Sequence, residues 1–464
     1  MKLTRREMIA GAAGLAALGS AGIYELVDQL TASPPRAEAA PARPEQHLLD
    51  GVRVVRDNGV EVLVPPLHHQ VVTAKVALTG DRHELRAAQA ELEYALTQLE
   101  RAYPSSPAGL GVTVAWGLPY FRRFVPAAAE QHLPLDRRAG KGALLDAIRF
   151  PSDPGDTILE DNDVAVLLRS DSLEHIAAAA KALFEDTRVL RPTSIRRGFA
   201  GGGFDGGTSL PKRMAMAAGI PGAELIPETS ELFLGFTSTQ AAGLGPGKIA
   251  NLETLGYADL RDSGYFRHGT HMHLSHIDED LEAWYLNFDF RERVDTAFRP
   301  NLKVAPGTLT VDQGPHDVES ERGVRRDYHT LGRIGHSASI QSTSRLLRAV
   351  RGPDGTVYEP GTAIPQRADF NTLDNPFAWS ASPQRDGMAD GPSAGLHFVV
   401  FNPTSDDFHR NRLAMDGHLP SEQLPFAPRA RGQGFNAVLR TTHRQNFLVP
   451  PRRHRAFPLA ELSS

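Results

Sequence analysis

Three segments of the chain carry residue types that could do chemistry together. The first is a glycine-rich loop with the pattern G-x-x-D-G, Gly202-Gly203-Phe204-Asp205-Gly206. Gly335-His336 lies far downstream, and Arg367-Ala368-Asp369 follows it. A carboxylate can take up and return a proton, a neutral imidazole can ligate a metal, and a guanidinium can stabilise developing negative charge. The three segments together could hold a metal centre and move a proton beside it, although a glycine-flanked aspartate is also common in ordinary turns.

The composition excludes several classes of site and partner. The chain has 464 residues and no cysteine, which rules out disulfides, iron–sulfur clusters and thiolate zinc sites. The formal net charge is -5 at pH 7, and no basic stripe suggests a nucleic-acid partner. A core large enough to fold without disulfides is expected from this length.

The N-terminus has the features of a targeting segment. Thr4-Arg5-Arg6-Glu7-Met8 resembles a twin-arginine motif, residues 9–23 are apolar and uncharged, and Ala37-Glu38-Ala39 is a candidate cleavage site. We therefore predict a twin-arginine signal peptide over residues 1–39, export to the periplasm or the extracellular space, and no stable membrane span after processing. An uncleaved N-terminal anchor is the alternative. Residues 40–66, rich in Pro, Ala and charge, are predicted to form a linker.

The rest of the chain shows two similar series of strands and helices. In the first, strands are predicted at 71–78, 112–117 and 163–168, with helices beginning at Asp81 and Ser172. In the second, strands are predicted at 231–236, 269–277 and 395–401, with helices at 278–285 and 404–415. This pattern favours an α+β fold of two ferredoxin-like halves with antiparallel sheets and flanking helices, divided at residues 67–225 and 226–455.

These landmarks, in this order, resemble those of the dye-decolorizing (DyP-type) peroxidase family over roughly residues 65–420. The resemblance is carried by the strand that runs from Leu110 to Phe121, the strand 163–171, the G-x-x-D-G loop, Gly335-His336 and the late strand Gly395-Leu396-His397-Phe398. It implies two ferredoxin-like halves of the dimeric α+β barrel type, with haem b held mainly by the second half.

The resemblance also implies roles for individual residues. Asp205 would be the distal acid–base residue, His336 would ligate the haem iron, and Arg367 would be the distal arginine. Asp369 would occupy a cofactor-facing position where some members of the family have a polar side chain. Hydrogen peroxide and a reducing substrate would be the partners.

The sequence departs from the family pattern in two places. Gly207 adds a glycine after the loop, which could displace Asp205. Residues 351–361 look like an inserted hairpin, which makes Arg351 a rival to Arg367. Arg345 could reach a haem propionate or could be solvated, and His329 is the alternative to His336.

A histidine-rich segment gives a second candidate metal site. His271 and His273 should point the same way in the predicted strand and could bind copper, zinc or non-haem iron. The alternatives are that they bind no metal or that one or both line the haem pocket. His68 and His69 are predicted to lie on a surface loop.

Three functions are therefore compatible with the sequence. The first is a secreted haem peroxidase that uses hydrogen peroxide to oxidise an unidentified one-electron donor or that acts on haem for iron recovery. The second is an exported haem- or metal-binding protein without catalysis. The third is a non-haem metalloenzyme based on His271 and His273. The sequence leaves open whether the protein forms a homo-oligomer.

Overall fold

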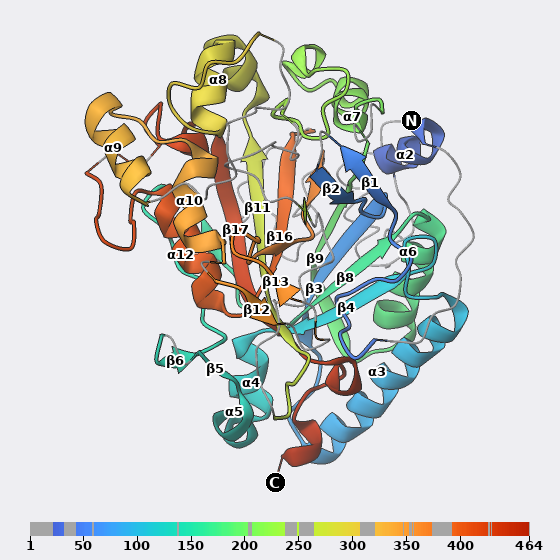
Figure 1. The fold of residues 1–464 in the computed structure, drawn as a ribbon. Coiled ribbons are helices and arrows are strands. Elements are labelled where there is room, and N and C mark those ends of the chain that lie inside the picture. Colours follow the sequence, from blue (N-terminus) through green and yellow to red (C-terminus); the bar gives the residue numbers. More distant parts are fainter. Residues whose placement is uncertain are drawn as a thin grey trace.

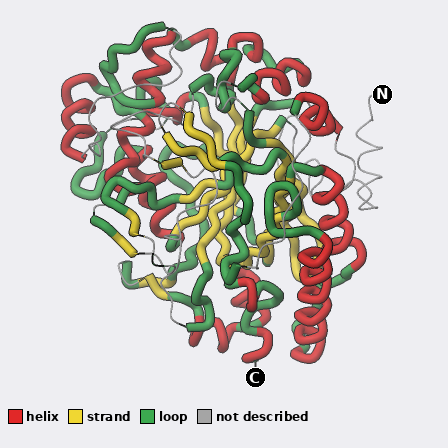
Figure 2. Tube along the Cα trace, turned by 45° about the vertical axis from the view of Figure 1, so that its right-hand side comes forward, coloured by secondary structure: helices red, strands yellow, loops and turns green. Residues whose placement is uncertain are grey.

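A computed structural model describes most of the chain. The described residues are 22–31, 43–57, 60–136, 139–202, 207–236, 248–249, 264–306, 321–346, 348–351, 355, 357–373, 392–425, 427 and 429–463. Strands occupy the middle of the molecule and helices surround them (Figures 1 and 2). Within the described part, no helix is long and apolar enough to cross a membrane.

The N-terminal half is a ferredoxin-like unit. Its sheet has the antiparallel strand order β9-β3-β8-β4, and helices α3 and α6 connect the strands as crossovers. The buried residues of α3 recur at the helical spacing expected from the sequence, from Leu85 to Leu99, and Asp81 caps the helix. The main elements are β3 (His68–Val76), α3 (Arg82–Ala102), β4 (Gly111–Trp116), α4 (Leu118–Phe124), α5 (Pro126–His132), β8 (Val164–Ser170), α6 (Leu173–Lys181), β9 (Leu190–Phe199) and α7 (Leu210–Ala218).

The C-terminal half repeats this topology with longer connections. Its strand order is β15-β16-β11-β17, again antiparallel, and β14 also pairs with β16. Helices α10 and α12 pack against each other beside this sheet (Figure 1). The main elements are β11 (Thr270–Glu279), α8 (Phe290–Ala297), α9 (Glu321–Leu331), α10 (His336–Ser344), β14 (Gln366–Arg367), β15 (Phe370–Thr372), β16 (Gly395–Asn402), α12 (Ser405–Met415) and β17 (Leu439–Val449).

The two sheets join edge to edge and close into a barrel. One seam is the pair Asn371–Phe199 between β15 and β9, and the other is Leu448–Trp116 between β17 and β4. Gly198 is required at the first seam, because a Cβ there would lie 2.0 Å from the Asn371 carbonyl oxygen. The predicted α+β fold of two ferredoxin-like halves is therefore confirmed, and both halves contribute apolar side chains to the core inside the barrel.

Smaller elements lie around the barrel. They are α2 (Glu25–Leu30), β1 (Val54–Asp57), β2 (Val60–Leu63), β5 (Leu135–Asp136), β6 (Lys141–Gly142), β7 (Ile158–Leu159), β10 (Lys248–Ile249), β12 (Val350–Arg351) and β13 (Val357–Tyr358). The β12–β13 pair confirms a hairpin in this segment, and its being an insertion stays a prediction.

Part of the predicted linker 40–66 is packed into the folded body, since residues 46–49 and 62–63 are buried, so this part is not a free linker. β1 and β2 form a hairpin, and the Gln46 side chain accepts a hydrogen bond from the Val114 amide and donates one to the Val114 carbonyl. Gln46 can make both bonds because its amide carries a donor and an acceptor. Proline-rich composition therefore did not indicate a flexible segment here.

Part of the predicted signal peptide also packs into the body. Helix α2 and the preceding residues bury Tyr24 and Val27 in an apolar cluster that combines residues of α7 with residues of the C-terminal half. The Tyr24 hydroxyl accepts a hydrogen bond from the Leu373 amide and lies 3.1 Å from the Thr372 hydroxyl. A helix in this segment is thus part of the fold, and the boundary at residue 39 stays a prediction.

The prediction of a strand at residues 231–236 was wrong, because this segment forms turns and bends. Its apolar residues, including Phe233, are buried as a strand's would be. The backbone carbonyls are satisfied by side chains instead of a neighbouring strand: Tyr285 donates to the Phe233 carbonyl, and Trp284 donates to the Leu234 carbonyl.

Candidate functional site

A cavity of about 260 Å³ lies between the outer face of the C-terminal sheet and helices α10 and α12. We call it the inner cavity. Side chains from the sheet line one wall, and side chains from the two helices line the opposite wall. The lining residues used below are His336, Arg412, Arg367, Asp369, Glu279 and Arg444. Much of the remaining lining is apolar or aromatic and includes Leu396, Phe398 and Phe408.

His336 is the first residue of α10 and stands on the helix side of the inner cavity. Gly335 lets the chain enter the helix there, because a Cβ at this position would lie 2.0 Å from the Phe298 carbonyl oxygen. The His336 ring packs at 4.7 Å from the ring of Phe435. Its Nδ1 is buried without a hydrogen-bond partner among the described residues, which leaves Nε2 as the nitrogen able to reach the cavity.

The charge state of His336 suits a metal ligand. Burial lowers its pKa from 6.5 to about 4, and the positive charges of Arg412 and Arg367 act in the same direction. The imidazole is therefore neutral near pH 7, with a lone pair available for coordination.

Arg367 and Asp369 stand on the sheet side. They alternate along the chain with Ala368 and Phe370, which face the barrel interior, so the period of the strand places both charged groups in the cavity wall. Arg367 Nε lies 3.7 Å from Asp369 Oδ1. Only 7% of Asp369 is exposed, and this oxygen has no hydrogen-bond partner among the described residues. Burial raises the pKa of the Asp369 carboxyl, while Arg367 lowers it.

Glu279 is a functional candidate that the sequence analysis missed. It is the last residue of β11 and lines the inner cavity beside Asp369. Burial raises its pKa from 4.5 to about 8, and the charges of Asp369 and Asp278 add to the effect. Perturbed carboxyl groups of this kind cluster at functional sites.

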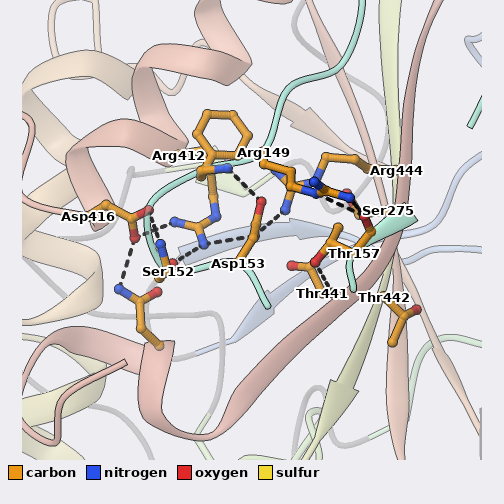
Figure 3. Close-up of polar contacts among 12 residues, drawn as sticks. Arg149, Ser152, Asp153, Thr157, Ser275, Arg412, Asp416, Thr441, Thr442 and Arg444 are labelled. Atoms are coloured by element: carbon orange, nitrogen blue, oxygen red, sulfur yellow. Dashed lines mark hydrogen bonds and ion pairs between the residues drawn. The ribbon is translucent and has the colours of Figure 1, made fainter. Parts of the chain in front are cut away.

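Arg412 and Arg444 form a second group that the sequence did not reveal. Asp153 lies between them, 2.7 Å from Arg444 Nη2 and 3.4 Å from Arg412 Nη2 (Figure 3). Asp416 accepts a second hydrogen bond from Arg412 at 2.6 Å. Nε and Nη1 of Arg444 are buried without a partner among the described residues. The network thus fixes the Arg444 guanidinium beside the cavity, with two donors that no described residue accepts.

The remaining predicted residues have different positions. Asp205 lies outside the described residues, although Gly201 and Gly202, which lead to it, adopt the left-handed backbone conformation. Arg345 directly follows α10 as its C-cap residue, and its backbone forms an isolated antiparallel β-bridge with Ala363. It is not among the residues that line the inner cavity.

The two rival residues lie away from the cavity. Arg351 is exposed on the β12–β13 hairpin and donates to the Gly355 carbonyl. His329 is exposed on α9 and lies 3.0 Å from Glu422. Of the alternatives, it is therefore Arg367 and His336 that the fold brings to the cavity.

His271 and His273 are structural in this fold. His271 Nε2 lies 2.5 Å from the Ser405 hydroxyl, and the two ring nitrogens of His273 lie 2.6 Å from Asn446 and Ser275. Among the described residues, no group of three or more His, Asp or Glu side chains could hold a metal ion. The structure therefore gives no support to a non-haem metal site on His271 and His273.

The expectation that His68 and His69 lie on the surface was also wrong. Both are buried in β3. His68 Nε2 lies 2.6 Å from Asp28 of α2, and the His69 ring stacks on Phe370. Their burial reflects pairing with segments that are distant in sequence.

The chain belongs to a family of unknown function, DUF7405, whose model matches residues 66–451. No curated protein sequence matches the chain.

Several solved structures resemble the fold at low sequence identity. Ferric DtpA from Streptomyces lividans is 16% identical, with a TM-score of 0.49, over 89% of this chain and 96% of its own. A DyP-type peroxidase from Cellulomonas bogoriensis is 18% identical, with a TM-score of 0.48, over 88% and 96%. A variant of DypB from Rhodococcus jostii RHA1 in complex with heme is 12% identical, with a TM-score of 0.48, over 84% and 95%. Similarity at this level does not assign a function, which has to be argued from the cavity.

Proposed function

We propose that this protein is a haem-dependent peroxidase of the DyP type that reduces hydrogen peroxide and oxidises a separate electron donor. The proposal rests on one observation: two opposite walls of the inner cavity carry different chemical groups. A neutral imidazole, His336, stands on the helix side, and a guanidinium–carboxyl pair, Arg367 and Asp369, stands on the sheet side. One wall can ligate a metal and the other can handle protons and negative charge.

The lining of the cavity fits haem b. His336 would supply a nitrogen ligand to the haem iron, and the contact of its ring with the Phe435 ring restricts the orientation of the imidazole. Leu396, Phe398 and other apolar side chains suit the flat apolar faces of a porphyrin. Arg444 and Arg412 would hold the haem carboxylates, since arginine binds carboxylates well. When bound, the haem would supply the redox chemistry.

The protein residues would handle charge and protons beside it. Arg367 would orient peroxide and stabilise negative charge as the O–O bond breaks. Asp205 would take a proton from one peroxide oxygen and return it to the other. In support, β9 ends at Phe199, six residues before Asp205 in the sequence, and Phe199 pairs with the cavity-lining Asn371.

Export through the twin-arginine route belongs to the same proposal. It rests on Arg5 and Arg6 and the apolar stretch that follows them. Replacing both with lysine should retain the protein in the cytoplasm, which cell fractionation would measure. Unchanged export of the double variant would indicate another route.

The deciding experiment is the absorbance spectrum of the purified protein. We expect a Soret band, and we expect His336→Ala to remove or strongly shift it while circular dichroism shows a folded protein. The matched control is His329→Ala, which changes an exposed histidine of the neighbouring helix α9 and should leave the band in place. A protein without a Soret band after haem reconstitution would refute the proposal. A Soret band without turnover of peroxide would leave a haem-binding protein.

A further inference from the structure

Glu279 lines two separate spaces in the molecule. One is the inner cavity, and the other is a pocket of about 340 Å³ that includes the exposed residues Asp280 and Glu282. We call this second space the outer pocket. Glu279 is therefore common to the lining of the solvent-facing pocket and the lining of the buried cavity.

The carboxyl group is not neutralised by a close partner. Its Oε2 is buried without a hydrogen-bond partner among the described residues. The nearest basic residue on the neighbouring strand β17, Arg440, is already paired with Asp278 at 3.3 Å and with Asp156 at 2.6 Å. The buried oxygen therefore has no ion pair or hydrogen bond of its own among the described residues.

The charged and titratable groups around Glu279 come from several elements. Asp369 and Arg367 face it from the β14–β15 segment, and Asp278 precedes it on β11. Arg440 and Arg429 line the outer pocket with it.

Tyr285, from the short helix that follows β11, completes this set, and burial raises its pKa above the ordinary value. Glu279 therefore has the neighbouring negative charges Asp369 and Asp278, which oppose its own ionisation, with the nearer guanidiniums engaged elsewhere.

We propose that Glu279 is a proton-relay residue that exchanges protons between the outer pocket and the inner cavity, with Asp369 as its inner partner. The inference rests on the proposed function, because it gives the cavity a supply of protons. In one direction, a hydrated proton in the outer pocket protonates the Glu279 carboxylate, and the protonated carboxyl then releases a proton to Asp369 or to water in the inner cavity. Only O–H bonds form and break, and no group is oxidised or reduced.

The titration range of Glu279 is consistent with this role. A pKa of about 8 lets the group both bind and release a proton near neutral pH. Asp369 is 7% exposed, and its Oδ1, which lies 3.7 Å from Arg367 Nε, has no hydrogen-bond partner among the described residues, so it can receive the proton on the inner side.

Cyanide binding to the haem-loaded protein tests the relay. Hydrogen cyanide must give up its proton to a group in the cavity when cyanide binds iron. We expect the wild-type binding rate to change near pH 8 and Glu279→Gln to lose this change and to bind about 10²-fold more slowly. Glu279→Asp, which keeps an acid, should retain a pH-dependent rate. Asp280→Asn removes a carboxylate that lines only the outer pocket and should behave like wild type. An unchanged pH profile in Glu279→Gln would overturn the proposal.

An infrared titration provides a readout that does not need haem. The wild-type protein should show a protonated carboxyl band at pH 7 that disappears through about pH 8 and that is missing in Glu279→Gln. Absence of this band from the wild type overturns the relay whether or not haem binds. If the protein shows the infrared carboxyl band but no Soret band, the proposed peroxidase function is refuted while the protonated Glu279 carboxyl is retained. The failure of the proposed function can therefore be told apart from the failure of the relay.

Discussion

Replacing Asp153 with asparagine should destabilise the protein far more than the same change at an exposed ion pair. Asp153 and Arg444 are both only 1% exposed, and their N–O distance is 2.7 Å. Asparagine keeps the shape and can still accept a hydrogen bond, but it leaves the buried Arg444 charge without its directly paired carboxylate. Removing one partner of a buried pair typically costs about 3–5 kcal/mol.

Asp146→Asn is the matched control. Asp146 pairs with Arg122 at the same distance of 2.7 Å, but both side chains are 61% exposed. Solvent screens such a pair, so its loss should cost roughly 0.2–1 kcal/mol.

Urea unfolding of the wild type and both variants, with linear extrapolation, measures the two free-energy changes. Equal losses in the two variants would refute the reasoning that burial, and not distance, sets the value of the Asp153 pair. A large loss confined to Asp153→Asn would support the view that this carboxylate holds the arginine side of the cavity.

Two further predictions concern the cavity and its protonation. Arg367→Leu should slow the reaction with peroxide by about 10²-fold, whereas Arg351→Leu, at the exposed hairpin, should not; stopped-flow mixing would show the difference, and equal rates would count against the Arg367 role. Acidification should destabilise the protein. Burial lowers the pKa values of four histidines in the folded state, to about 3 for His47 and His271 and to about 4 for His336 and His409. As the pH falls below about 6.5, these histidines therefore take up protons in the unfolded chain before they do so in the folded protein. Each imidazole should cost about 2 kcal/mol between pH 7 and pH 5, and urea midpoints that stay constant over this range would contradict the expectation.

The sequence was sufficient to predict those helices and strands that show a regular apolar spacing or an apolar run within their own residues. The apolar spacing in α3 and the apolar runs of β4, β8 and β16 are sufficient to identify them. β17 was missed, because Leu439–Val449 is rich in Arg, Thr, His, Gln and Asn and yet largely buried. Its polar groups are satisfied by distant partners, as when Gln445 accepts a hydrogen bond from the Asn162 amide. Such pairing leaves no periodic signal in the strand itself.

The same distinction applies to the candidate site. His336, Arg367 and Asp369 were identified from short motifs, and the fold brings them to one cavity. Glu279 and Arg444 carry no motif, because their environment depends on tertiary neighbours such as Asp369 and Asp153. Residues that belong to a sequence motif can therefore be predicted from the sequence. Residues whose pKa or ion pairing depends on burial among tertiary neighbours cannot.

The packing of α2 bears on whether a peptidase can remove residues 1–39 from the folded protein. A peptidase that cut after Ala39 would remove Val27, which is fully buried, and Tyr24, which is 2% exposed. It would also deprive the Leu373 amide of its acceptor. The loss of Val27 burial alone is worth about 1.5–3 kcal/mol. Helix α2 is therefore part of the folded core as well as of the predicted signal segment, and its removal should lower the stability of the fold.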